Sequence, residues 1–279
     1  MGGSKFERLF ADKNRVFRRE CHGCPIDKIE LPLSMCGSMQ WTFKDKVALV
    51  TGAGRGIGQA TAVALAAKGC RVALISRTQS ELEETRKRIE AAGGQAIALP
   101  ADLSDERAIA ELFETVTRKW GPVQILVNNA GMFHGALIGE QQTAEFDAVM
   151  AVNVRAVFLC TREIFRSAAA GNEATIINVA SISGVRGVEK FPGMAAYIAS
   201  KFAVIGLTEA SAVEGRALGV RVCCLAPGAV ETRMLREAAP HLKTQTTPDQ
   251  IARTIVMLAD EAQSSHLNGA VIEVFSNLA

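Results

Sequence analysis

From Lys44 onward, short apolar runs alternate with longer amphipathic segments. Most of the runs are apolar at every position, which is typical of strands covered on both faces. The runs occupy residues 47–50, 72–75, 96–99, 125–127, 175–179, 220–225 and 270–274. We therefore expect a mostly parallel seven-stranded sheet.

The segments between the runs have helical features. Residues 80–92 carry charges on one face and are followed by Gly93-Gly94, a common helix end, and residues 105–120 stop before Gly121-Pro122. Strands that alternate with helices predict βαβ units and right-handed crossovers, and hence a single-domain, doubly wound α/β fold. Ligands of such sheets bind beyond the carboxyl ends of the strands.

Residues 1–43 are polar, mixed in charge and without steady periodicity. We expect a flexible N-terminal extension there and one folded domain over residues 44–279. Met39 is a candidate for the natural start. The alternative of a metal site rests on three cysteines and a histidine, but zinc normally takes four ligands and we predict no metal site. Those residues are Cys21, His22, Cys24 and Cys36.

Composition narrows the class of protein. The 279 residues are 48% apolar and 22% charged, with a formal charge of +2. The size fits one domain with a large core, and the scattered basic residues argue against nucleic-acid or membrane partners. The seven cysteines are an odd number, and we find no apolar run of the roughly 18 residues that span a membrane. We therefore expect a cytoplasmic protein with reduced thiols.

The first run leads directly into a glycine-rich turn, Thr51-Gly-Ala-Gly-Arg-Gly-Ile-Gly58. Glycines allow backbone amides to approach a pyrophosphate, and the next helix presents its positive end to that anion. The spacing differs from G-x-G-x-x-G and lacks the G-K-[ST] of a nucleoside triphosphate loop. A plain glycine turn is the alternative, but the strand–turn–helix setting favours a dinucleotide site. Its candidate residues are Gly52, Gly56, Ile57 and Gly58.

The second run ends at Ser76-Arg77, a position where NAD-binding proteins place an acidic residue for the ribose 2′-hydroxyl. The nearest acid here is Glu81, inside the next predicted helix. Arg77 and Arg55 can instead bind a 2′-phosphate through charge-assisted hydrogen bonds. The alternative is that both arginines are solvated surface charges. We predict a preference for NADP(H), with NAD(H) as the other cofactor open to the site.

Tyr197 is the only tyrosine, and Lys201 follows it by four residues at the start of an apolar helical stretch. The two side chains share a helix face. An ammonium group near a phenol favours phenolate, so we expect the tyrosine pKa to fall toward working pH, as a general acid/base requires. A surface pair on an amphipathic helix is the alternative. Ser181, at the end of a predicted strand, adds a hydroxyl that can hold a substrate oxygen.

With these residues assembled, the chain resembles the short-chain dehydrogenase/reductase family, in its common single-domain branch with a Rossmann-type fold. The resemblance covers residues 44–279. Asp102 matches the residue that usually contacts the adenine. The Asn-Asn-Ala-Gly motif that lines the family's cofactor cleft is matched by Asn128, Asn129, Ala130 and Gly131.

The resemblance implies a catalytic tetrad of Asn153, Ser181, Tyr197 and Lys201. In it, hydride passes between the nicotinamide and the substrate carbon while Tyr197 transfers the proton at oxygen. Ser181 orients that oxygen, and Lys201 lowers the tyrosine pKa and binds the nicotinamide ribose. Asn153 positions a water that connects Lys201 to solvent.

The resemblance also assigns the loop after the sixth strand to the nicotinamide, with Thr232 bonding its carboxamide. The other candidates in that loop are Pro227, Gly228 and Val230. Three features depart from the family. The loop over residues 184–194 is slightly enlarged, the C-terminus reads Val-Phe-Ser-Asn in place of Val-Asp-Gly-Gly, and the segment 234–247 is short. We expect from the last that the site is open.

Three functions remain to be compared. The first is an NADP(H)-dependent carbonyl reductase or alcohol dehydrogenase, and the intact tetrad favours it. A cofactor-binding regulator or subunit without turnover and an NAD-linked alcohol dehydrogenase are the alternatives; a sugar epimerase would need more chain after Thr232 than is present. The family habit implies a homo-oligomer, a dimer or tetramer. The candidate pocket wall is apolar: Met132, Phe133, Met194 and Met234, with His134 beside it.

Overall fold

The computed structural model describes residues 43–276. By its internal contacts the chain divides into two units, residues 1–40 and residues 41–279. The expected extension, the candidate start at Met39 and the N-terminal cysteines lie outside the described residues. Phe43, which the sequence assigned to the extension, is fully buried in the hydrophobic core.

The described residues contain a seven-stranded sheet in which every pair of neighbouring strands is parallel, in the order β3-β2-β1-β4-β5-β6-β7. This confirms the doubly wound fold expected from the apolar runs. The strands are β1 (Val47–Thr51), β2 (Arg71–Ser76), β3 (Gln95–Pro100), β4 (Ile125–Asn128), β5 (Ala174–Val179), β6 (Val220–Pro227) and β7 (Val271–Val274). The strands β1 and β4 are buried at every position, because helices cover both faces of the sheet.

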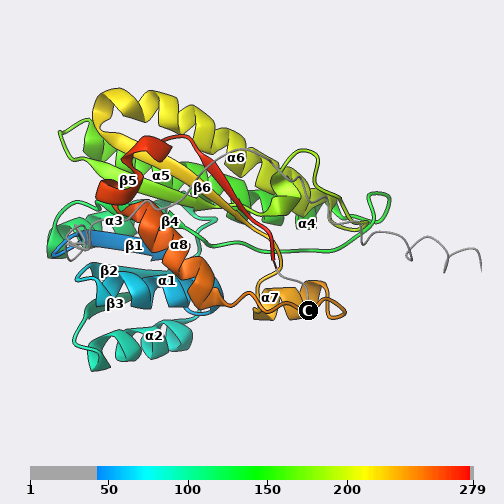
Figure 1. Ribbon diagram of the computed structural model, residues 1–279, viewed down its shortest axis with the longest axis horizontal. Coiled ribbons are helices and arrows are strands. Elements are labelled where there is room, and N and C mark those ends of the chain that lie inside the picture. Colours follow the sequence, from blue (N-terminus) through cyan, green and yellow to red (C-terminus); the bar gives the residue numbers. More distant parts are fainter. Residues whose placement is uncertain (1–42, 277–279) are drawn as a thin grey trace, which may run out of the picture. The chain divides into compact units, whose positions relative to one another are not determined.

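Helices lie on both faces of this sheet (Figure 1). The α-helices are α1 (Gly56–Ala67), α2 (Gln79–Ala91), α3 (Glu106–Trp120), α4 (Thr143–Met150), α5 (Ala156–Ala168), α6 (Ala195–Gly215), α7 (Arg233–Ala238), α8 (Pro248–Ala259) and α9 (Glu261–Ser264). Short helical turns of other types are η2 (Ala151–Arg155), η3 (Ile182–Gly184), η4 (Arg216–Leu218) and η5 (Ser265–Leu267).

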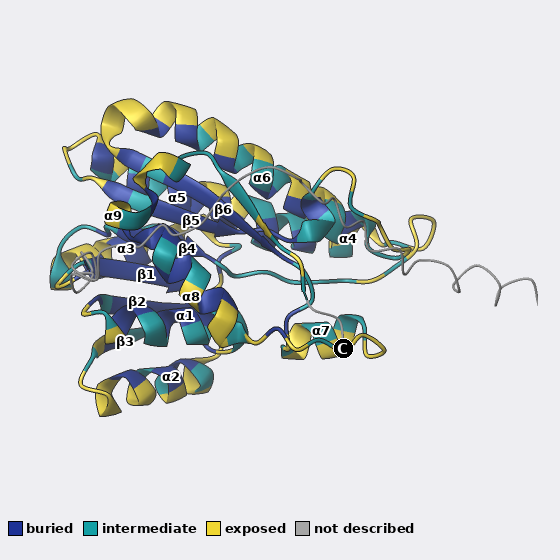
Figure 2. Ribbon diagram, in the orientation of Figure 1, coloured by how far each residue is buried: buried dark blue, intermediate teal, exposed yellow. Residues whose placement is uncertain are grey.

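Two large apolar clusters hold these layers together. One joins the sheet to α1, α2 and α8, and includes Leu65, Leu82 and Ile255. The other joins the opposite face to α3 and α5, and includes Phe113 and Ile164. Figure 2 shows the buried residues concentrated in the sheet and on the helix faces turned toward it. The chain crosses from one face to the other between β1 and β4, so the topological switch point lies there.

The helical region Ala195–Leu218 is long and apolar enough to cross a membrane by length and composition, with a mean hydropathy of 1.2 over its best window. The region is nevertheless not an uninterrupted apolar run, because it includes Lys201, Glu209 and Glu214, and the core helix of a globular protein passes the same test. The helix packs against β6 and η3, and it carries the buried Lys201 on its inner face. This packing buries 33% of the residues in that window.

Candidate active site

Most of the predicted site residues lie at the carboxyl ends of β1, β4, β5 and β6 and at the first turns of α1 and α6. This is the edge of the sheet where a doubly wound fold binds ligands. In a doubly wound sheet a ligand crevice is expected at the switch point, here between β1 and β4, because the chains leaving these two strands turn to opposite faces.

The glycine turn is built so that only glycines fit. Gly52 and Gly56 have φ values of 67° and 56°, which side chains rarely adopt. A Cβ on Gly58 would lie 2.5 Å from Asn129 Nδ2 and closer still to the Gly52 carbonyl oxygen. The turn is therefore packed backbone against backbone.

Asn129 and Ala130 of the fourth strand's motif fasten this turn to β4. The Thr51 hydroxyl accepts the N–H groups of Asn129 and Ala130, both at 3.0 Å. In return the Asn129 side chain donates to the Thr51 carbonyl at 2.9 Å and to the Gly52 carbonyl at 3.4 Å. These bonds explain why the two motifs occur together in the sequence.

The start of α1 fits an anion. Its N-cap residue, Arg55, makes no side-chain cap, and the first turn contains no acidic residue. The first N–H groups of the helix and its positive dipole end are thus not neutralised from within the helix. Ile57 in the same turn packs against the apolar cluster of α1 and α8. The residues present therefore fit the pyrophosphate of a dinucleotide.

The side chains at the end of β2 and β3 form the opposite end of the crevice. Arg77 and Asp102 are both exposed. Hydrogen bonds from the Ser104 N–H and hydroxyl hold the pKa of Asp102 below its usual range, and the charge of Arg77 adds to this. Arg55 donates to Glu81 at 3.3 Å. The structure thus brings each predicted arginine toward a carboxylate, Arg77 toward Asp102 and Arg55 toward Glu81.

Tyr197 and Lys201 occupy the first turns of α6, on one face as predicted. Lys201 is 4% exposed, and its Nζ donates to the Val179 carbonyl at 3.0 Å. The Nζ atom lies 5.6 Å from the centroid of the Tyr197 ring. Burial lowers the pKa of Lys201 to about 8.

The pKa of Tyr197 is raised, which is opposite to the fall expected from the sequence. Burial raises the pKa of the phenol, and a hydrogen bond with Ser181 lowers it by less. The Lys201 ammonium lies beside the ring and donates to the Val179 carbonyl. The phenol therefore stays protonated at neutral pH.

Ser181 follows β5 directly and is 9% exposed. Its hydroxyl accepts the Ser183 N–H at 3.2 Å and begins the short helix η3. This helix packs closely on α6, since a Cβ on Gly184 would lie 2.5 Å from the backbone carbon of Lys201. The close packing sets Ser181 beside Tyr197, and it favours Ser181 over Ser183 as the hydroxyl that faces the phenol.

Asn153 lies in η2, a single π-helical turn between α4 and α5. Such turns are uncommon and often occur at functional sites. The buried Asn153 side chain accepts the Met132 N–H at 2.8 Å and donates to the Met132 carbonyl at 2.9 Å. It also donates to the hydroxyl of Ser200 at 3.0 Å, a partner that sequence reasoning missed.

Asn153 and Lys201 face the same point above Gly131. A Cβ on Gly131 would lie 3.5 Å from Asn153 Oδ1 and 3.6 Å from Lys201 Nζ. The absence of a side chain at this glycine keeps the space between the two polar groups open. The four tetrad residues predicted from the sequence are thus connected: Ser181 to Tyr197, Lys201 over the Tyr197 ring, and Asn153 to Lys201 through this space.

A buried chain of polar side chains also links the strands to α6. Asn128 donates to Asn178 at 2.9 Å, and Asn178 donates to Thr208 at 2.9 Å. The chain joins β4, β5 and α6, and all three side chains are at most 2% exposed. The family motif included Asn128, but the sequence carried no signal for the roles of Asn178 and Thr208.

The loop after β6 returns to the glycine turn. Thr232 caps α7 by accepting the Leu235 N–H at 3.3 Å, and its methyl carbon lies 3.4 Å from a Cβ built on Gly56. Val230 is buried in the core, and Pro227 ends β6. The short segment from which an open site was expected begins with α7, next to the cofactor turn.

The atypical C-terminus packs against the same loop. The Ser276 hydroxyl donates to the Ala229 carbonyl, and the Gly228 N–H donates to the Val274 carbonyl at 2.8 Å. A Cβ on Gly228 would lie 2.7 Å from Ser276 Oγ and 3.2 Å from Ile182 Cδ1. The C-terminal residues therefore border the substrate side of the site.

The substrate side is largely apolar. The Phe133 ring meets the Tyr197 ring edge to face, with centroids 5.6 Å apart. The Ala136 N–H donates to the Gly193 carbonyl at 3.1 Å, which ties the loop after β4 to the loop before α6. His134 Nε2 lies 3.1 Å from a carboxylate oxygen of Glu145, so the His134 side chain joins the loop after β4 to α4.

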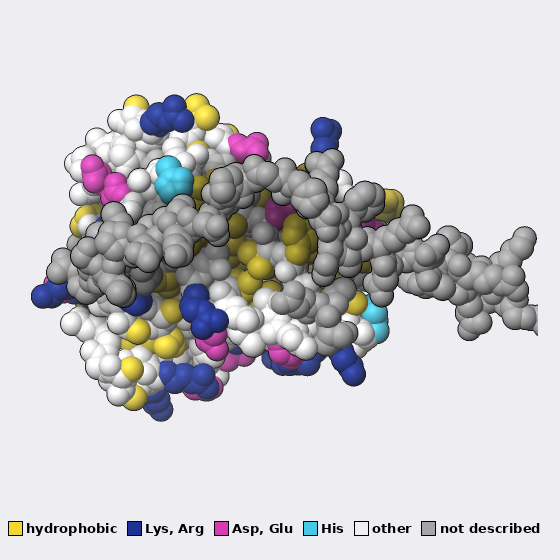
Figure 3. All heavy atoms as spheres, viewed as in Figure 1, with side chains coloured by type: hydrophobic (Ala, Val, Ile, Leu, Met, Phe, Trp, Pro, Cys, Tyr) yellow, Lys and Arg dark blue, Asp and Glu magenta, His cyan; other side chains and the backbone are white. Residues whose placement is uncertain are grey.

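Apolar side chains gather in a hollow between α7 and the elements around α4 and α6 (Figure 3). Several large apolar residues on α7 and on the bordering loops are exposed: Met234 on α7, and Leu137, Ile138, Phe191 and Phe275 on the loops.

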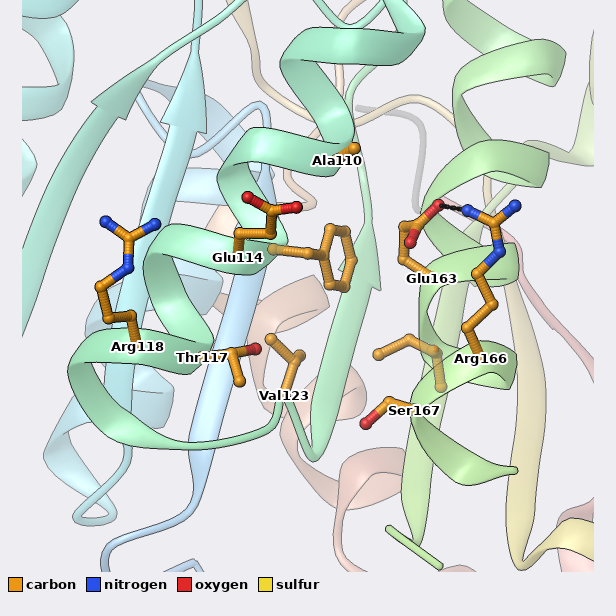
Figure 4. A pocket seen from close by; sticks show the side chains of 10 residues that line it. Ala110, Glu114, Thr117, Arg118, Val123, Glu163, Arg166 and Ser167 are labelled. Carbon is orange, nitrogen blue, oxygen red and sulfur yellow. Dashed lines mark hydrogen bonds and ion pairs between the residues drawn. The ribbon is translucent and has the colours of Figure 1, made fainter. Parts of the chain in front are cut away.

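A separate groove of about 660 Å³ lies between α3 and α5 (Figure 4). Val123, which lines it, precedes β4, so the groove extends toward the amino end of that strand. It contains none of the candidate site residues. Its polar lining includes an ion pair between Glu163 and Arg166 at 2.8 Å.

The described cysteines are buried and free, as predicted: Cys70, Cys160, Cys223 and Cys224. Burial raises the pKa of Cys70 and Cys160 to about 12. Within residues 43–276 no three His, Cys, Asp or Glu side chains are placed to hold a metal ion.

Comparisons with known proteins agree with this geometry. Residues 46–243 match the family described as short chain dehydrogenase. A 3-oxoacyl-[acyl-carrier-protein] reductase of Synechocystis sp. is 35% identical, over 82% of this chain and 95% of the relative. Levodione reductase of Leifsonia aquatica is 32% identical, over 83% and 93% respectively. The crystal structure of 3-ketoacyl-(acyl-carrier-protein) reductase from Brucella melitensis complexed with NADH is 34% identical, with a TM-score of 0.75, over 84% of this chain and 98% of that one.

Proposed function

Because the chain belongs to the short-chain dehydrogenase/reductase family, we propose that it transfers a hydride between NADP(H) and a carbonyl or alcohol, with Tyr197 as the general acid/base. The chain is an NAD(P)-dependent oxidoreductase that acts on CH–OH or carbonyl groups of small molecules. The observation that carries the finer proposal is the contact of Ser181 with the Tyr197 phenol, beside the buried Lys201 and the glycine turn.

In this proposal the bound cofactor supplies or accepts the hydride at its nicotinamide ring. Ser181 donates a hydrogen bond to the substrate oxygen and orients it toward Tyr197. Tyr197 gives its proton to that oxygen during reduction. The protonated phenol favoured by burial is the form that this step requires.

Lys201 and Asn153 support the proton transfer. The buried ammonium of Lys201 stabilises the phenolate left after the proton has gone. Asn153 Oδ1 and Lys201 Nζ both face the point above Gly131, where we propose that a water is bound. Such a water would return the proton from solvent through Lys201 to Tyr197.

The remaining candidates are assigned to the cofactor. Amides of the glycine turn bind the pyrophosphate, Asp102 binds the adenine, and Arg55 and Arg77 bind the 2′-phosphate. Lys201 binds the nicotinamide ribose, and Thr232 binds the carboxamide. The other contacts come from Gly52, Gly56, Ile57, Gly58, Asn129, Ala130, Gly131, Pro227, Gly228 and Val230. The anion-binding start of α1 supports this arrangement.

The substrate is proposed to carry an apolar group next to its carbonyl. Phe133 packs on Tyr197, so it borders the place where a carbonyl meets the phenol. The exposed apolar residues on the loops around the site extend this surface outward. We expect bulky apolar ketones and 3-oxoacyl thioesters to be reduced faster than small polar ketones.

A second copy of the chain is proposed as a partner, in a dimer or tetramer. Large apolar side chains are exposed on α5 and α6, away from the site: Phe158, Phe202 and Val213. We also propose the reducing cytoplasm as its compartment, since the four described cysteines are free thiols.

The test is NADPH oxidation across a panel of ketones, quinones and 3-oxoacyl thioesters, with Tyr197→Phe beside the wild type. Loss of the proton donor should lower kcat by at least about 10²-fold. NADPH affinity, measured by calorimetry, should stay within about twofold, since the variant removes one hydroxyl.

Ser181→Ala and Ser183→Ala make a matched pair of hydroxyl deletions. Only the first should reduce turnover strongly, because Ser183 contributes its N–H rather than its hydroxyl to the Ser181 contact. Turnover retained in Tyr197→Phe would sink the mechanism. Tight NADPH binding without turnover of any compound would favour the alternative function, a cofactor-binding regulator or subunit.

A further inference from the structure

The chain after β7 holds the loop that follows β6. The Ser276 hydroxyl donates to the Ala229 carbonyl, one residue beyond the bond between the Gly228 N–H and the Val274 carbonyl. The Ser276 oxygen also lies 2.7 Å from the Cβ position of Gly228. This ending departs from the family's Val-Asp-Gly-Gly, in which glycine stands in place of Ser276 and has no hydroxyl to donate. The bond to Ala229 is therefore a feature of this chain's own C-terminus.

A second hydroxyl donates to the same carbonyl. Thr244, in the segment between α7 and α8, donates from Oγ1 to the Ala229 carbonyl at 3.1 Å. The Thr246 carbonyl accepts the Glu231 N–H at 2.9 Å, so residues 244–246 lie beside the loop. A carbonyl oxygen has two lone pairs and can accept from both hydroxyls. We call the contact of Thr244 and Ser276 with this carbonyl the Ala229 clamp.

The Ala229 clamp closes the base of the segment that contains α7. The chain leaves the loop at Thr232, forms α7 and returns at Thr244. The helix is six residues long and none of its residues is buried. Because a helix with few buried contacts is held only weakly by packing, the position of α7 depends on the hydrogen bonds at the base of the segment.

Thr232 connects the Ala229 clamp to the cofactor site. Its hydroxyl accepts the Leu235 N–H at 3.3 Å and begins α7, and the hydroxyl proton is left for donation to a ligand. Thr232 lies three residues after Ala229 in the chain, with the buried Val230 between them. A change in the position of the Ala229 carbonyl is therefore passed along a short, anchored piece of backbone to Thr232.

We propose that Ser276 is a positioning residue for the nicotinamide half of the cofactor: through the Ala229 clamp it fixes the loop that carries Thr232. The inference rests on the proposed function, which assigns Thr232 to the carboxamide. Ser276 acts through the loop and does not itself bind the cofactor. Its effect is therefore confined to the nicotinamide end, because the adenosine end is assigned to the glycine turn and to the ends of β2 and β3.

The test is Ser276→Ala, with binding of NADP⁺ and of adenosine 2′,5′-bisphosphate measured by calorimetry in the absence of turnover. NADP⁺ should bind about three- to tenfold more weakly, because the loop has lost one of its hydrogen bonds. The bisphosphate has no nicotinamide and should bind within about twofold of the wild type. NAD⁺ and 5′-AMP, which lack the 2′-phosphate, form a second pair that should show the same difference.

Thr244 offers a conservative rescue at the other side of the clamp. Thr244→Val removes the hydroxyl at nearly constant volume and should weaken NADP⁺ binding as Ser276→Ala does. Thr244→Ser keeps the hydroxyl and should bind NADP⁺ like the wild type, because the donor to the Ala229 carbonyl remains.

Hydrogen exchange of the free protein gives a readout that does not depend on the cofactor. Peptides covering residues 229–236 should exchange faster in Ser276→Ala, since the bonds of the Glu231 and Leu235 N–H groups are loosened. Ser264→Ala is the matched control, because its buried hydroxyl also donates to backbone carbonyls, at the end of α8. It should lower the free energy of unfolding and leave both the nucleotide affinities and the exchange of residues 229–236 unchanged.

Three results would overturn the role of Ser276. Unchanged NADP⁺ binding in Ser276→Ala would separate the clamp from the cofactor. Equal weakening of NADP⁺ and the bisphosphate, or the same change in Ser264→Ala, would reduce the effect to general stability. If the wild type binds no dinucleotide, the proposed function fails, and the exchange of residues 229–236 still decides whether Ser276 holds the loop.

Discussion

Lys201 shows at the residue scale how burial and chemistry are combined. Its ammonium group is almost fully buried, with the Val179 carbonyl as its hydrogen-bond partner. Burying this charge is unfavourable, and the pKa of Lys201 falls from 10.5 to about 8 as a result. The same burial strengthens the field of the ammonium at the neighbouring Tyr197. The proposed proton transfer thus depends on a charge that destabilises the folded protein.

Comparison with Lys201→Met should show the free-energy cost of burying this charge as a pH dependence of the difference in stability. Below about pH 8 the lysine is charged in both the folded and the unfolded chain, so the wild type bears the full penalty of at most about 3 kcal/mol. Between about pH 8 and 10.5 the folded state has lost the proton and the unfolded state still binds it, so the penalty disappears as pH rises. Urea unfolding of both proteins across this range should show the wild type gaining free energy of unfolding relative to the variant. A difference that is constant or falls with pH would contradict the buried charge.

Some functional candidates were predictable from the sequence pattern, and others were not. Tyr197, Lys201 and Ser181 were predicted because their residue types and spacing carry the chemistry. Ser200 and Thr208 were missed, because a serine or threonine in an apolar helix has no signal of its own until its buried partner is known. Glu81 was noticed and set aside, since its helix position gave no indication that its carboxylate faces the turn.

At the scale of elements, the turn between β1 and α1 is the most constrained part of the site. Gly52 and Gly56 adopt left-handed φ values, and Gly58 has no room for a Cβ. The Thr51 hydroxyl and the Asn129 side chain tie the turn to the end of β4. The glycine motif and the Asn-Asn-Ala-Gly motif therefore act as one structural unit.

Gly58→Ala should disrupt this unit. The new Cβ would press on the Gly52 carbonyl and on Asn129 Nδ2, and overpacking of this kind costs about 1–3 kcal/mol. We expect a lower free energy of unfolding in urea and weaker NADPH binding by calorimetry. Gly139→Ala is the matched control, because nothing lies within 4 Å of a Cβ there. Equal effects of the two substitutions would show that the turn tolerates a side chain.

The elements that hold the catalytic candidates are likewise fixed by close packing and by hydrogen bonds between elements. Gly184 allows η3 to pack on α6, and the chain Asn128–Asn178–Thr208 joins two strands to that helix. The π-helical turn η2 directs Asn153 inward to Met132. None of these features has a periodic pattern, so the apolar runs predicted the elements but not the contacts between them.

For the whole molecule, the remaining question is how the exposed apolar side chains on α5 and α6 are covered. Phe158 and Val213 are 49% and 72% exposed. Exposed apolar surface of this kind is typical of interaction sites. A second copy of the chain is the partner that we propose.

Light scattering of the purified protein should therefore give a multiple of 29.7 kDa. Phe158→Lys should shift the mass toward the monomer, because a charge on a buried apolar interface is strongly unfavourable. Ile138→Lys places the same charge on the exposed loop at the site and should leave the mass unchanged. A monomeric wild type would exclude the proposed assembly.

The order of apolar runs and helical segments by itself determined the doubly wound sheet, because a strand buried on both faces needs apolar residues at every position. The glycine turn and the Tyr-x-x-x-Lys pair likewise pointed to the candidate site, since their chemistry depends on neighbours in the chain. Only the tertiary structure decided which groups meet across elements: Glu81 with Arg55, Asn153 with Met132, and the burial that raises the pKa of Tyr197. The physical reason is that hydrogen bonding and desolvation depend on distances in space, which the spacing of residues along a chain does not contain.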